Sequence, residues 1–404
     1  MKLLIINQPL NNRGDESAHK GLLRAILSQK HSLEIECLFI GVPSETLKHY
    51  VVNDDRVKYI NIQNTIKGWS FWGKFCLKYG LQNLWVLHPT IKKVLKIYKE
   101  ADWVVCAPGG ISMGGFQNWP HLFSLYFAKK LGKNIAYYGR SFGPFPINTY
   151  SQRRYKKLSI DILRYFKYLS IRDKVTEKLA RDLNLEFVST VDSAFLDYPI
   201  AEISSEVQEK IKSEKYIVYV PNLLIWHYNY RGRVSKEAVM SFFTNMGKLL
   251  LESFPNHNII MLPQTFNYNN YMDDYIFFKE LSNNIADKRI IVVSDQYSSD
   301  IQQCIIRGAS CMVGARYHSV VFALNNNVPF VALSYEHKIA GLLEALGKEE
   351  CMVDIVHSMD DVKSAKKSLE EFKYKLSVIG KDAKSQTEAK KIARHSLNVF
   401  LAQL

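Results

Sequence analysis

The amino-acid sequence predicts an α/β protein built from two doubly wound, Rossmann-like domains that face each other across a cleft. Three observations support this fold class. Short apolar runs alternate with longer helical patterns, as they do in β-α-β units. The alternation runs once through the first half of the chain and again through the second. Between the halves, around residues 197–215, turn-forming and charged residues interrupt it.

The apolar runs predict parallel strands, and the helical patterns predict the crossovers between them. In the first half the predicted strands are Leu3–Asn7, Leu33–Ile40, Val57–Ile60, Trp103–Ala107, Asn134–Tyr138, Tyr168–Ile171 and Glu186–Ser189. Helices are predicted to begin near Glu16, Ser44, Trp72, Pro120, Tyr150 and Asp173. In the second half the predicted strands are Tyr216–Val220, Asn258–Leu262, Arg289–Val293, Cys311–Val313 and Phe330–Leu333.

These elements predict an N-terminal domain over residues 1–197, with a helical insertion at about 66–100, and a C-terminal domain over residues 198–353. Residues 354–404 carry apolar side chains at helical spacing and predict amphipathic helices. We expect these helices to pack on the chain's own domains. A contact in a homo-oligomer is the alternative.

The charge balance is basic, with 53 Lys and Arg against 39 Asp and Glu and a net charge of +14. An excess of this kind fits an anionic partner: nucleic acid, a membrane surface or a phosphorylated small molecule. Nucleic acid is not expected as a partner, because no nucleic-acid-binding motif occurs and the basic residues read as dispersed. The 47% hydrophobic content excludes disorder as the main state.

The cysteines and the apolar runs indicate where the protein works. The six cysteines are scattered without metal-ligand spacing, so neither a metal site nor a redox role is predicted. The apolar run after Lys2 is too short for a signal peptide, and no run reaches the roughly 18 residues of a membrane span. We therefore expect a cytoplasmic protein.

In a parallel sheet, ligands bind outside the carboxyl ends of the strands, so residues that follow predicted strands are candidates for a site. After the first strand come Asn12, Gly14, Asp15 and Glu16, just before a helix. Glycine lets the backbone approach a ligand closely, and a helix N-terminus binds anions. The alternative is that Asp15 or Glu16 caps the helix and Gly14 only permits the turn.

Two glycine clusters follow later strands, at Gly109 and Gly110 and at residues 139–143. They predict loops that face a ligand, with simple turns as the alternative. Arg140 lies between glycines and is a candidate for a two-point contact to a carboxylate or phosphate. Arg172 ends another strand beside Asp173, which is placed to cap a helix. Arg172 either binds a ligand or pairs with Asp173.

The strongest constellation follows the strand that ends near Gly314. It places Arg316 and His318 two residues apart at the start of a helix, and Glu336 and Lys338 follow the next strand. Cationic side chains and helix N-termini in this arrangement predict a site for a small, doubly charged phosphate or carboxylate donor.

The same residues resemble the polysaccharide pyruvyl transferases over roughly residues 12–345. The matching motifs are Asn12-x-Gly14-Asp15-Glu16, Gly109-Gly110, Gly139-x-x-x-Gly143-Pro144, Arg172-Asp173, residues 192–196, Arg316-x-His318, Val328-Pro329 and Tyr335-x-x-Lys338. The resemblance implies two domains of the GT-B type. It also implies an enzyme that moves pyruvate from phosphoenolpyruvate onto two hydroxyls of a sugar as a ketal, in capsule, exopolysaccharide or lipopolysaccharide biosynthesis.

The resemblance further implies roles for single residues. Arg316 and His318 match the donor-site pair of the family, and Arg172 matches an arginine that contacts the donor. Arg140 departs from the family, which often has glutamine there.

From the chemistry we expect His318 to act as general acid and either Asp15 or Glu16 to act as base. The expected donor contacts are Arg172, Arg316, Lys338 and Arg140, and the expected acceptor-side residues are Asn12, Gly14, Gly109, Gly110 and Glu336. Phosphoenolpyruvate is a co-substrate in this scheme, which requires no metal or other cofactor. The acceptor would be a sugar or a lipid-linked oligosaccharide, with peripheral contact to the anionic inner face of the cell membrane.

Two other functions fit the sequence less well. One is a GT-B glycosyltransferase that uses a nucleotide sugar. The other, from a different class, is a non-catalytic protein that binds anions or a membrane surface.

Overall fold

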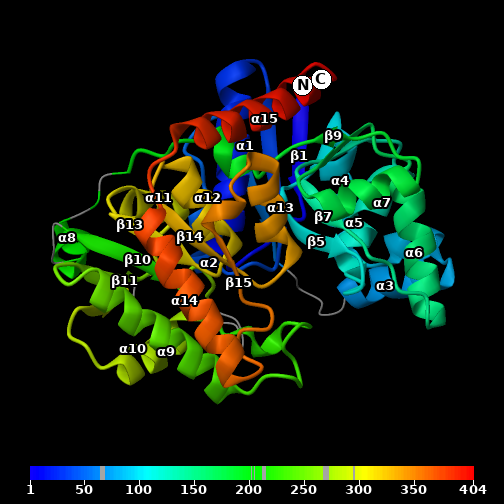
Figure 1. Ribbon diagram of the computed structural model, residues 1–404. Coiled ribbons are helices and arrows are strands. Elements are labelled where there is room, and N and C mark those ends of the chain that lie inside the picture. The colour runs from blue at the N-terminus through cyan, green and yellow to red at the C-terminus, as the bar shows by residue number, and fades with distance from the viewer. Residues whose placement is uncertain (64–68, 202, 204, 212–214, 267–272, 294–295) are drawn as a thin grey trace. The chain divides into compact units, whose positions relative to one another are not determined.

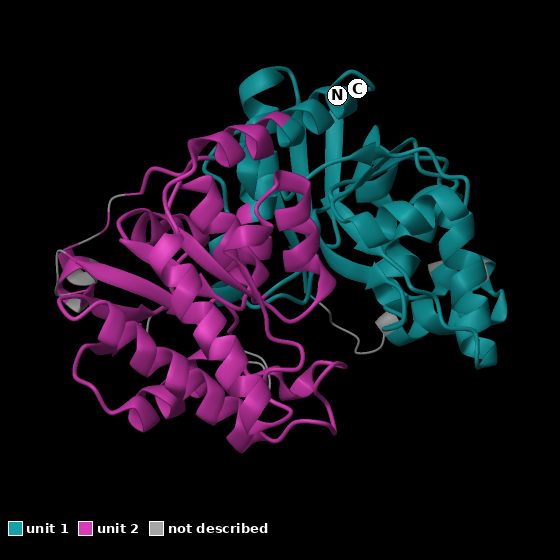
Figure 2. Cartoon of the chain, in the orientation of Figure 1, with its two compact units in different colours: residues 1–10, 18–197, 392–404 teal, residues 11–17, 198–391 magenta. Residues whose placement is uncertain are grey.

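The computed structural model describes residues 1–404 except 64–68, 202, 204, 212–214, 267–272 and 294–295. The chain divides into two compact units (Figure 2). Unit 1 contains residues 1–10, 18–197 and 392–404, and unit 2 contains residues 11–17 and 198–391. The sequence prediction instead kept residues 1–197 together and set residues 354–404 apart. Its boundary residues 212–214 and the start of its insertion, residues 66–68, lie outside the described residues.

Unit 1 is built on a parallel sheet with the strand order β3-β2-β1-β4-β6-β8-β9 (Figure 1). Its strands are β1 (Lys2–Ile6), β2 (Glu34–Ile40), β3 (Val57–Ile62), β4 (Trp103–Cys106), β6 (Asn134–Tyr137), β8 (Tyr168–Ile171) and β9 (Val188–Ser189). Its helical elements are α1 (Arg13–Gln29, from residue 18 onward), α2 (Ser44–Leu47), η1 (Lys48–Tyr50), α3 (Trp69–Tyr79), η2 (Gln82–Leu87), α4 (Pro89–Glu100), α5 (Trp119–Lys130), α6 (Tyr150–Leu163), α7 (Lys174–Asp182) and η3 (Ser193–Leu196).

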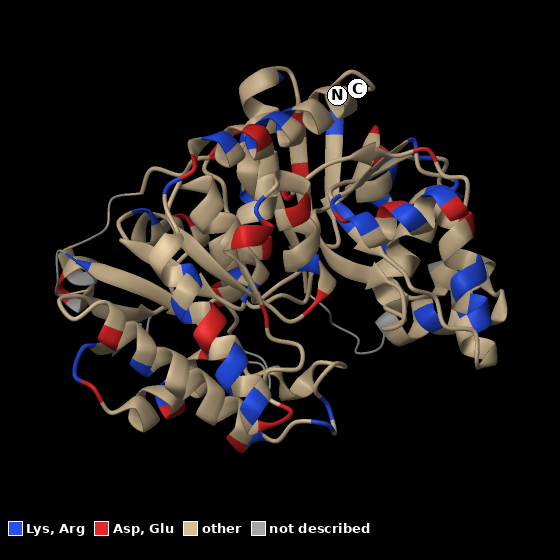
Figure 3. Ribbon diagram, in the orientation of Figure 1, with Lys and Arg blue, Asp and Glu red and all other residues tan. Residues whose placement is uncertain are grey.

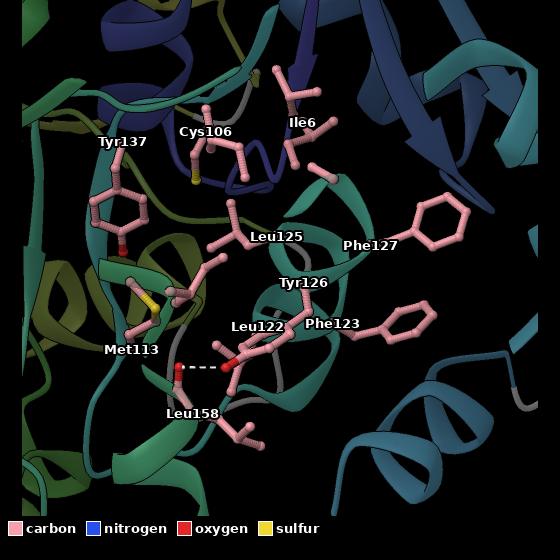
Figure 4. Packing of buried hydrophobic residues seen from close by; sticks show 14 of the residues in the cluster. Ile6, Cys106, Met113, Leu122, Phe123, Leu125, Tyr126, Phe127, Tyr137 and Leu158 are labelled. Carbon is pink, nitrogen blue, oxygen red and sulfur yellow. Dashed lines mark hydrogen bonds between the residues drawn. The ribbon is translucent and has the colours of Figure 1, made fainter. Parts of the chain in front are cut away.

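The strands of unit 1 are apolar on both faces because helices cover both faces of the sheet. Along β1, Leu4 and Ile6 belong to one buried cluster, and Leu3 and Ile5 belong to another. Figure 4 shows the first cluster, in which side chains of α5 pack beside Ile6 and Cys106. There the Tyr126 hydroxyl donates a hydrogen bond to the Leu158 carbonyl at 3.2 Å. The sheet therefore holds its loops on a rigid base.

Unit 2 repeats this topology, with the strand order β12-β11-β10-β13-β14-β15 and parallel pairing throughout. Its strands are β10 (Tyr216–Val220), β11 (Asn258–Met261), β12 (Ile290–Val292), β13 (Cys311–Gly314), β14 (Phe330–Ser334) and β15 (Met352–Asp354). Its helical elements are α8 (Ser205–Ile211), η4 (Leu224–Trp226), α9 (Lys236–Ser253), α10 (Asp274–Ile285), α11 (Ser299–Arg307), α12 (Tyr317–Asn325), α13 (His337–Leu346), η5 (Glu349–Cys351) and α14 (Val362–Val378).

Both sheets follow the Rossmann order, in which the chain reverses its direction of travel across the sheet beside the first strand. The predicted class, α/β with two doubly wound Rossmann-like domains, is confirmed. Each strand expected from the apolar runs is present, with ends that differ by one or two residues in most cases.

The sequence prediction missed three strands. β5 (Gly109–Met113) and β7 (Arg140–Phe142) pair as a small parallel sheet, although their glycines predicted loops. Glycine is depleted in strands, so the sequence pattern hid a pairing that is held by backbone contacts. One such contact is the hydrogen bond from Gly143 N to Met113 O at 2.7 Å. The third strand, β15, is only three residues long and joins the edge at β14.

The C-terminal helices pack on the chain itself, as expected. Phe372 of α14 is buried within unit 2. The last helix, α15 (Ala383–Leu401), contributes Leu397 and Phe400 to the core of unit 1, and Tyr168 OH donates to Ser396 O at 2.6 Å. Within the described part of the chain, no helix has both the length and the apolar character needed to cross a bilayer.

Candidate active site

In unit 2 the strand order reverses between β10 and β13, and a Rossmann-like fold binds ligands outside the carboxyl ends of such strands. Arg316 and His318 lie at this point. Arg316 is the N-cap residue of α12, although its side chain makes no capping hydrogen bond, and His318 is the second residue of the helix. The strand, turn and helix expected around this pair are therefore present.

The guanidinium of Arg316 is held by the carboxylate of Asp274. Arg316 Nε donates to Asp274 Oδ1 at 3.1 Å, and Nη2 contacts the same oxygen. The second oxygen of Asp274 accepts hydrogen bonds from the backbone N–H groups of Gln264 and Thr265, each at 3.0 Å. Burial raises the pKa of Asp274, while Arg316 and these N–H groups oppose the rise. The orientation of Arg316 is thus fixed by the first residue of α10.

Asp274 was not predicted as a site residue. An aspartate pair before a helix indicates capping, and the neighbouring Asp273 does cap α10 by accepting from Tyr275 N and Ile276 N. The signal that distinguishes the two residues is burial, because Asp274 is 2% exposed. A buried carboxylate needs a partner, and only the tertiary structure supplies Arg316.

The imidazole of His318 lies directly against the backbone of Gly14. A Cβ atom at position 14 would stand 1.7 Å from His318 Cγ and 1.9 Å from Nδ1, far inside van der Waals contact. A close approach was predicted for this glycine, but the approaching group is a side chain of the same unit. Gly14 therefore makes room for the proposed catalytic histidine.

The first turn of α1, which carries Gly14, belongs to unit 2. Its cap is Asn12, whose Oδ1 accepts from Gly14 N at 2.8 Å and from Asp15 N at 3.4 Å. The alternative that Asp15 or Glu16 caps this helix is therefore wrong, because both residues lie inside the first turn of α1, after the cap position. The turn is attached to the loop after β11 by the hydrogen bond from Arg13 N to Gln264 O at 2.9 Å.

Asp15 and Glu16 have different surroundings. Glu16 is fully buried, and it accepts from Arg13 Nη1 at 3.1 Å and from the backbone N–H and hydroxyl of Ser299 at 2.8 and 2.9 Å. Ser299 is the first residue of α11, so Glu16 connects the first turn of α1 to the first turn of α11. Asp15 is half-buried and keeps access to solvent.

Glu336, which follows β14, contacts both a lysine and a histidine. Its carboxylate lies 3.2 Å from Lys338 Nζ and 3.4 Å from His227 Nε2. Burial disfavours the ionised form, but the hydrogen bond with His227 and the charge of Lys338 lower the pKa of Glu336 to about 2. His227 is 4% exposed and was not predicted. It lies in an aromatic stretch that reads as core.

Gln264, at the carboxyl end of β11, has a buried side-chain amide. It is 1% exposed, and neither its oxygen nor its nitrogen forms a hydrogen bond with the described residues. A buried amide is costly unless it is bonded, so it marks a position where a polar ligand group or a water molecule is expected. The backbone of the same residue contacts Asp274 and Arg13.

The predicted residues of unit 1 are more enclosed. Arg172 is 9% exposed and pairs with Asp192, whereas Asp173 caps α7 by accepting from Thr176 N at 2.8 Å. Pairing between Arg172 and Asp173, the alternative considered above, is thus not what the structure shows.

Arg140 is 1% exposed, and its Nη1 lies 3.2 Å from Cys106 Sγ and 3.3 Å from His121 Nδ1. Gly109 makes room for this guanidinium, since a Cβ atom there would stand 2.8 Å from Arg140 Nη2. At Gly110 the equivalent position is open. Arg140 is therefore packed into the base of the small β5–β7 sheet.

The predicted residues divide between the units. Unit 2 brings together Arg316 with Asp274, His318 with Gly14, and Lys338 with Glu336, and it also contains Asn12, Asp15 and Glu16. Unit 1 contains Gly109, Gly110, Arg140 and Arg172.

Comparison with solved structures agrees with the two-unit fold. UDP-GlcNAc 2-epimerase from Methanocaldococcus jannaschii superposes with a TM-score of 0.57 at 14% identity, covering 98% of this chain and 100% of that one. A UGT transferase from Siraitia grosvenorii gives a TM-score of 0.56 at 11% identity, covering 100% and 99%. At these identities the likeness concerns the fold alone, which is GT-B-like.

Sequence comparison is more specific. The amylovoran biosynthesis protein AmsJ from Erwinia amylovora is 22% identical in an alignment of 393 positions that covers 89% of this chain and 89% of AmsJ. The family described as polysaccharide pyruvyl transferase matches residues 12–337, a range that runs from the cap of α1 to the start of α13 and includes Arg316 and His318. This chain belongs to the polysaccharide pyruvyl transferase family.

Proposed function

We propose that the protein transfers pyruvate from phosphoenolpyruvate onto two hydroxyls of a sugar as a cyclic ketal, during the synthesis of an exopolysaccharide or a related polymer. Membership of the family and the similarity to AmsJ support this role. The observation that carries the proposal is the arrangement of Arg316 and His318 at the start of α12, the first fixed by Asp274 and the second by Gly14.

Phosphoenolpyruvate carries a phosphate and a carboxylate, and both need cationic or N–H donors. Arg316 and the N-terminus of α12 supply such donors, and Lys338 adds a second cation in unit 2. Gln264 adds a buried amide that forms no hydrogen bond with the described residues. We keep Arg172 as a donor contact on the strength of the family resemblance. The enclosed guanidinium of Arg140 fits support of the β5–β7 sheet better than a donor contact.

The proposed reaction begins when His318 protonates the methylene carbon of phosphoenolpyruvate, which leaves an oxocarbenium-like carbon at C2. A sugar hydroxyl adds to C2 and gives up its proton to a carboxylate. The bond from C2 to the phosphate oxygen then breaks, and the phosphate leaves with the proton that the carboxylate had taken, so the carboxylate is ionised again. A second hydroxyl closes the ketal. Its proton returns to the imidazole, so His318 ends the cycle as it began. Histidine suits both transfers because it exchanges protons near neutral pH.

Of the two predicted bases, Asp15 fits better than Glu16. Both oxygens of Glu16 already accept hydrogen bonds from Arg13 and Ser299, and the residue is closed to solvent. Asp15 lies one residue away in the same turn and is half-buried. A base must reach the hydroxyl it deprotonates, which an enclosed carboxylate cannot do.

The acceptor in this proposal is a sugar or a lipid-linked oligosaccharide that the cytoplasmic enzyme meets at the inner face of the cell membrane. The basic character of the chain supports a peripheral contact with anionic lipid there.

The proposal is tested by mixing purified protein with phosphoenolpyruvate and acceptors that contain galactose or mannosamine. We expect release of phosphate and a gain of about 70 Da in the acceptor, the mass of a pyruvate ketal. His318→Ala should abolish both signals, whereas His395→Ala, at an exposed position of α15, should change neither. Full activity in His318→Ala would remove the histidine from the mechanism, and no phosphate release with any acceptor would contradict the proposal.

Ligand-induced thermal shifts separate this function from a nucleotide-sugar glycosyltransferase. Phosphoenolpyruvate should raise the melting temperature, because a ligand stabilises the state that binds it. Stabilisation by UDP-sugars without any effect of phosphoenolpyruvate would favour the glycosyltransferase.

A further inference from the structure

The positive charge of the chain is concentrated in one segment. Between Arg56 and Ile160 the sequence contains 17 lysines and arginines, but its only acidic residues are Glu100 and Asp102. The rest of the chain is close to neutral, so this segment accounts for the whole net charge of +14. The basic residues are spread along the chain, as expected, and what distinguishes this segment is that it almost lacks acidic residues. The segment lies entirely in unit 1 and contains α3, η2, α4 and α6.

The same segment exposes large apolar side chains. Phe71 and Tyr79 of α3 are 70% and 55% exposed. Leu81, the N-cap residue of η2, and Leu84 and Leu87 within η2 are exposed as well, Leu87 to 63%. Residues three apart eclipse one another in a 3₁₀-helix, so these leucines form one apolar stripe. We call Phe71, Tyr79, Leu81, Leu84 and Leu87 the α3–η2 surface.

Two lysines and an arginine lie beside the α3–η2 surface. Lys74 and Lys78 follow Phe71 at helical spacing on α3, and Lys78 Nζ lies 5.3 Å from the centre of the Tyr79 ring. From α6, Arg154 donates to the Leu77 carbonyl at 3.3 Å, which brings the basic first turns of that helix next to α3. Figure 3 shows Lys and Arg along α6 and its surroundings.

The α3–η2 surface is firmly attached to unit 1. Trp72 Nε1 donates to the Leu84 carbonyl at 3.2 Å and ties α3 to η2. Below them, Trp85 is buried and packs edge-on against Phe123 of α5, with ring centres 5.0 Å apart. The exposed leucines therefore lie on a helical segment that is packed against unit 1 through other apolar side chains, such as Trp85.

We propose that the α3–η2 surface docks onto an anionic membrane, with its apolar side chains in the interface and the neighbouring lysines and arginine at the lipid phosphates. An exposed apolar patch with a basic rim is the pattern of an interfacial membrane contact. The charge argues against a second copy of the chain as the occupant, because two such surfaces would bring like charges together. The reason for such docking, access to a lipid-linked acceptor, rests on the proposed function.

Flotation of the full-length protein with lipid vesicles tests the surface without donor or acceptor. We expect binding to vesicles of phosphatidylcholine with roughly a third phosphatidylglycerol, little binding to phosphatidylcholine alone, and loss of binding at high salt. Leu84→Ser with Leu87→Ser should weaken binding about tenfold or more per leucine. Lys74→Gln with Lys78→Gln should weaken it about fivefold per lysine.

Matched controls lie on α14, which also exposes apolar and basic side chains. Val362→Ser with Tyr374→Ser, and Lys363→Gln with Lys367→Gln, should bind vesicles like the unaltered protein. All of the variants should keep the melting temperature, since the altered side chains are mainly exposed. Equal loss in the α14 variants, or equal binding to neutral and anionic vesicles, would overturn the assignment.

Sedimentation without lipid tests the other occupant. A dimer that the α3–η2 variants abolish would assign the surface to a second copy and overturn the membrane proposal. Phosphate release with a soluble acceptor should be unchanged in these variants, so a failure to bind vesicles and a failure of the proposed reaction are separate results.

Discussion

The imidazole of His318 fills the space that a side chain at position 14 would need, so a substitution at either position affects the other. The helical backbone at position 14 has no side chain because the imidazole fills the place of a Cβ. Arg316 likewise depends on a distant partner, because its guanidinium is oriented by the carboxylate of Asp274. At the scale of the residue, the proposed chemistry depends on partners that come from distant parts of the sequence.

Gly14→Ala should displace His318 while leaving α1 intact. Alanine favours a helix by about 1 kcal/mol over glycine, yet its methyl group would overlap the imidazole. We expect phosphate release to fall by about a hundredfold or more, because small misplacements of a catalytic group are that costly. Gly341→Ala in α13, where a Cβ atom meets nothing within 4 Å, is the matched control. Normal turnover in Gly14→Ala would show that His318 does not act.

Asp274→Asn should affect both stability and donor binding. Removing one partner of a buried ion pair costs about 3 kcal/mol, so the melting temperature should fall. If Asp274 positions Arg316, the KM for phosphoenolpyruvate should also rise about tenfold, with a smaller change in kcat. Asp273→Ala, which removes the cap of α10, should cost about 1 kcal/mol and leave KM unchanged. An unchanged KM in Asp274→Asn would limit its role to the fold.

The sequence predicted Arg316 and His318 because both follow a strand and precede a helix, a local pattern. It did not predict Asp274, His227 or Gln264, because what marks them as site residues is that they are buried and, for Asp274 and His227, which side chains they contact. Asp274 reads as a second cap, and His227 reads as part of an aromatic stretch. Both interact with residues far away in sequence. Single-sequence patterns do not carry such contacts.

At the scale of the element, the first turn of α1 combines two tasks. It seats His318 against Gly14, and through Glu16 it binds the start of α11. Apolar and helical periodicity predicted the helix itself, and even its approximate start. The use of its first turn by unit 2 could not be predicted, since the amphipathic pattern runs on without a break.

Asp15→Asn and Glu16→Gln should separate these tasks. Asp15→Asn should reduce phosphate release by about a hundredfold, the contribution of a general base, and leave the melting temperature within about a degree. Glu16→Gln should lower the free energy of unfolding by about 2 kcal/mol, because the neutral amide weakens the buried hydrogen bonds with Arg13 and Ser299. The measurements are initial rates and thermal melts. The opposite pattern would make Glu16 the base.

At the scale of the whole molecule, two units with the same strand order were predictable from the repeated alternation of apolar runs and helical patterns. Pairing of β5 with β7 was not, because their glycines carry no strand signal. The sequence also did not show that residues 11–17 belong to unit 2 while the residues on either side of them belong to unit 1. The same is true of residues 392–404, which belong to unit 1 although the residues before them belong to unit 2. Helices α1 and α15 continue smoothly across those boundaries.

Acid should weaken the two units over different pH ranges. In unit 1, burial lowers the pKa of His19 to about 3, so the folded state keeps it neutral. The stability that this gives is present above pH 6.5 and is lost as the pH falls from 6.5 towards 3, by roughly 4 kcal/mol. In unit 2, the depressed pKa of Glu336, about 2, gives stability that is present above pH 4.5 and is lost below it, by about 3 kcal/mol.

Melting temperatures measured from pH 7 down to pH 3 check this. His19→Gln should flatten the curve between pH 6.5 and 3, and Glu336→Gln should flatten it only below about pH 4.5. Curves parallel to that of the unaltered protein would contradict both assignments.

The early segment that seats His318 also decides how the chain can be divided. A fragment that begins at residue 198 would contain Arg316, His318 and the whole of the second sheet, yet it would lack Gly14, Glu16 and the N-cap Asn12. His318 would lose its packing against the backbone of Gly14, and Ser299 at the start of α11 would lose its hydrogen bond to the carboxylate of Glu16. Cutting at the midpoint therefore gives no self-sufficient half, whereas adding back a short peptide covering residues 11–17 should restore the missing contacts of unit 2.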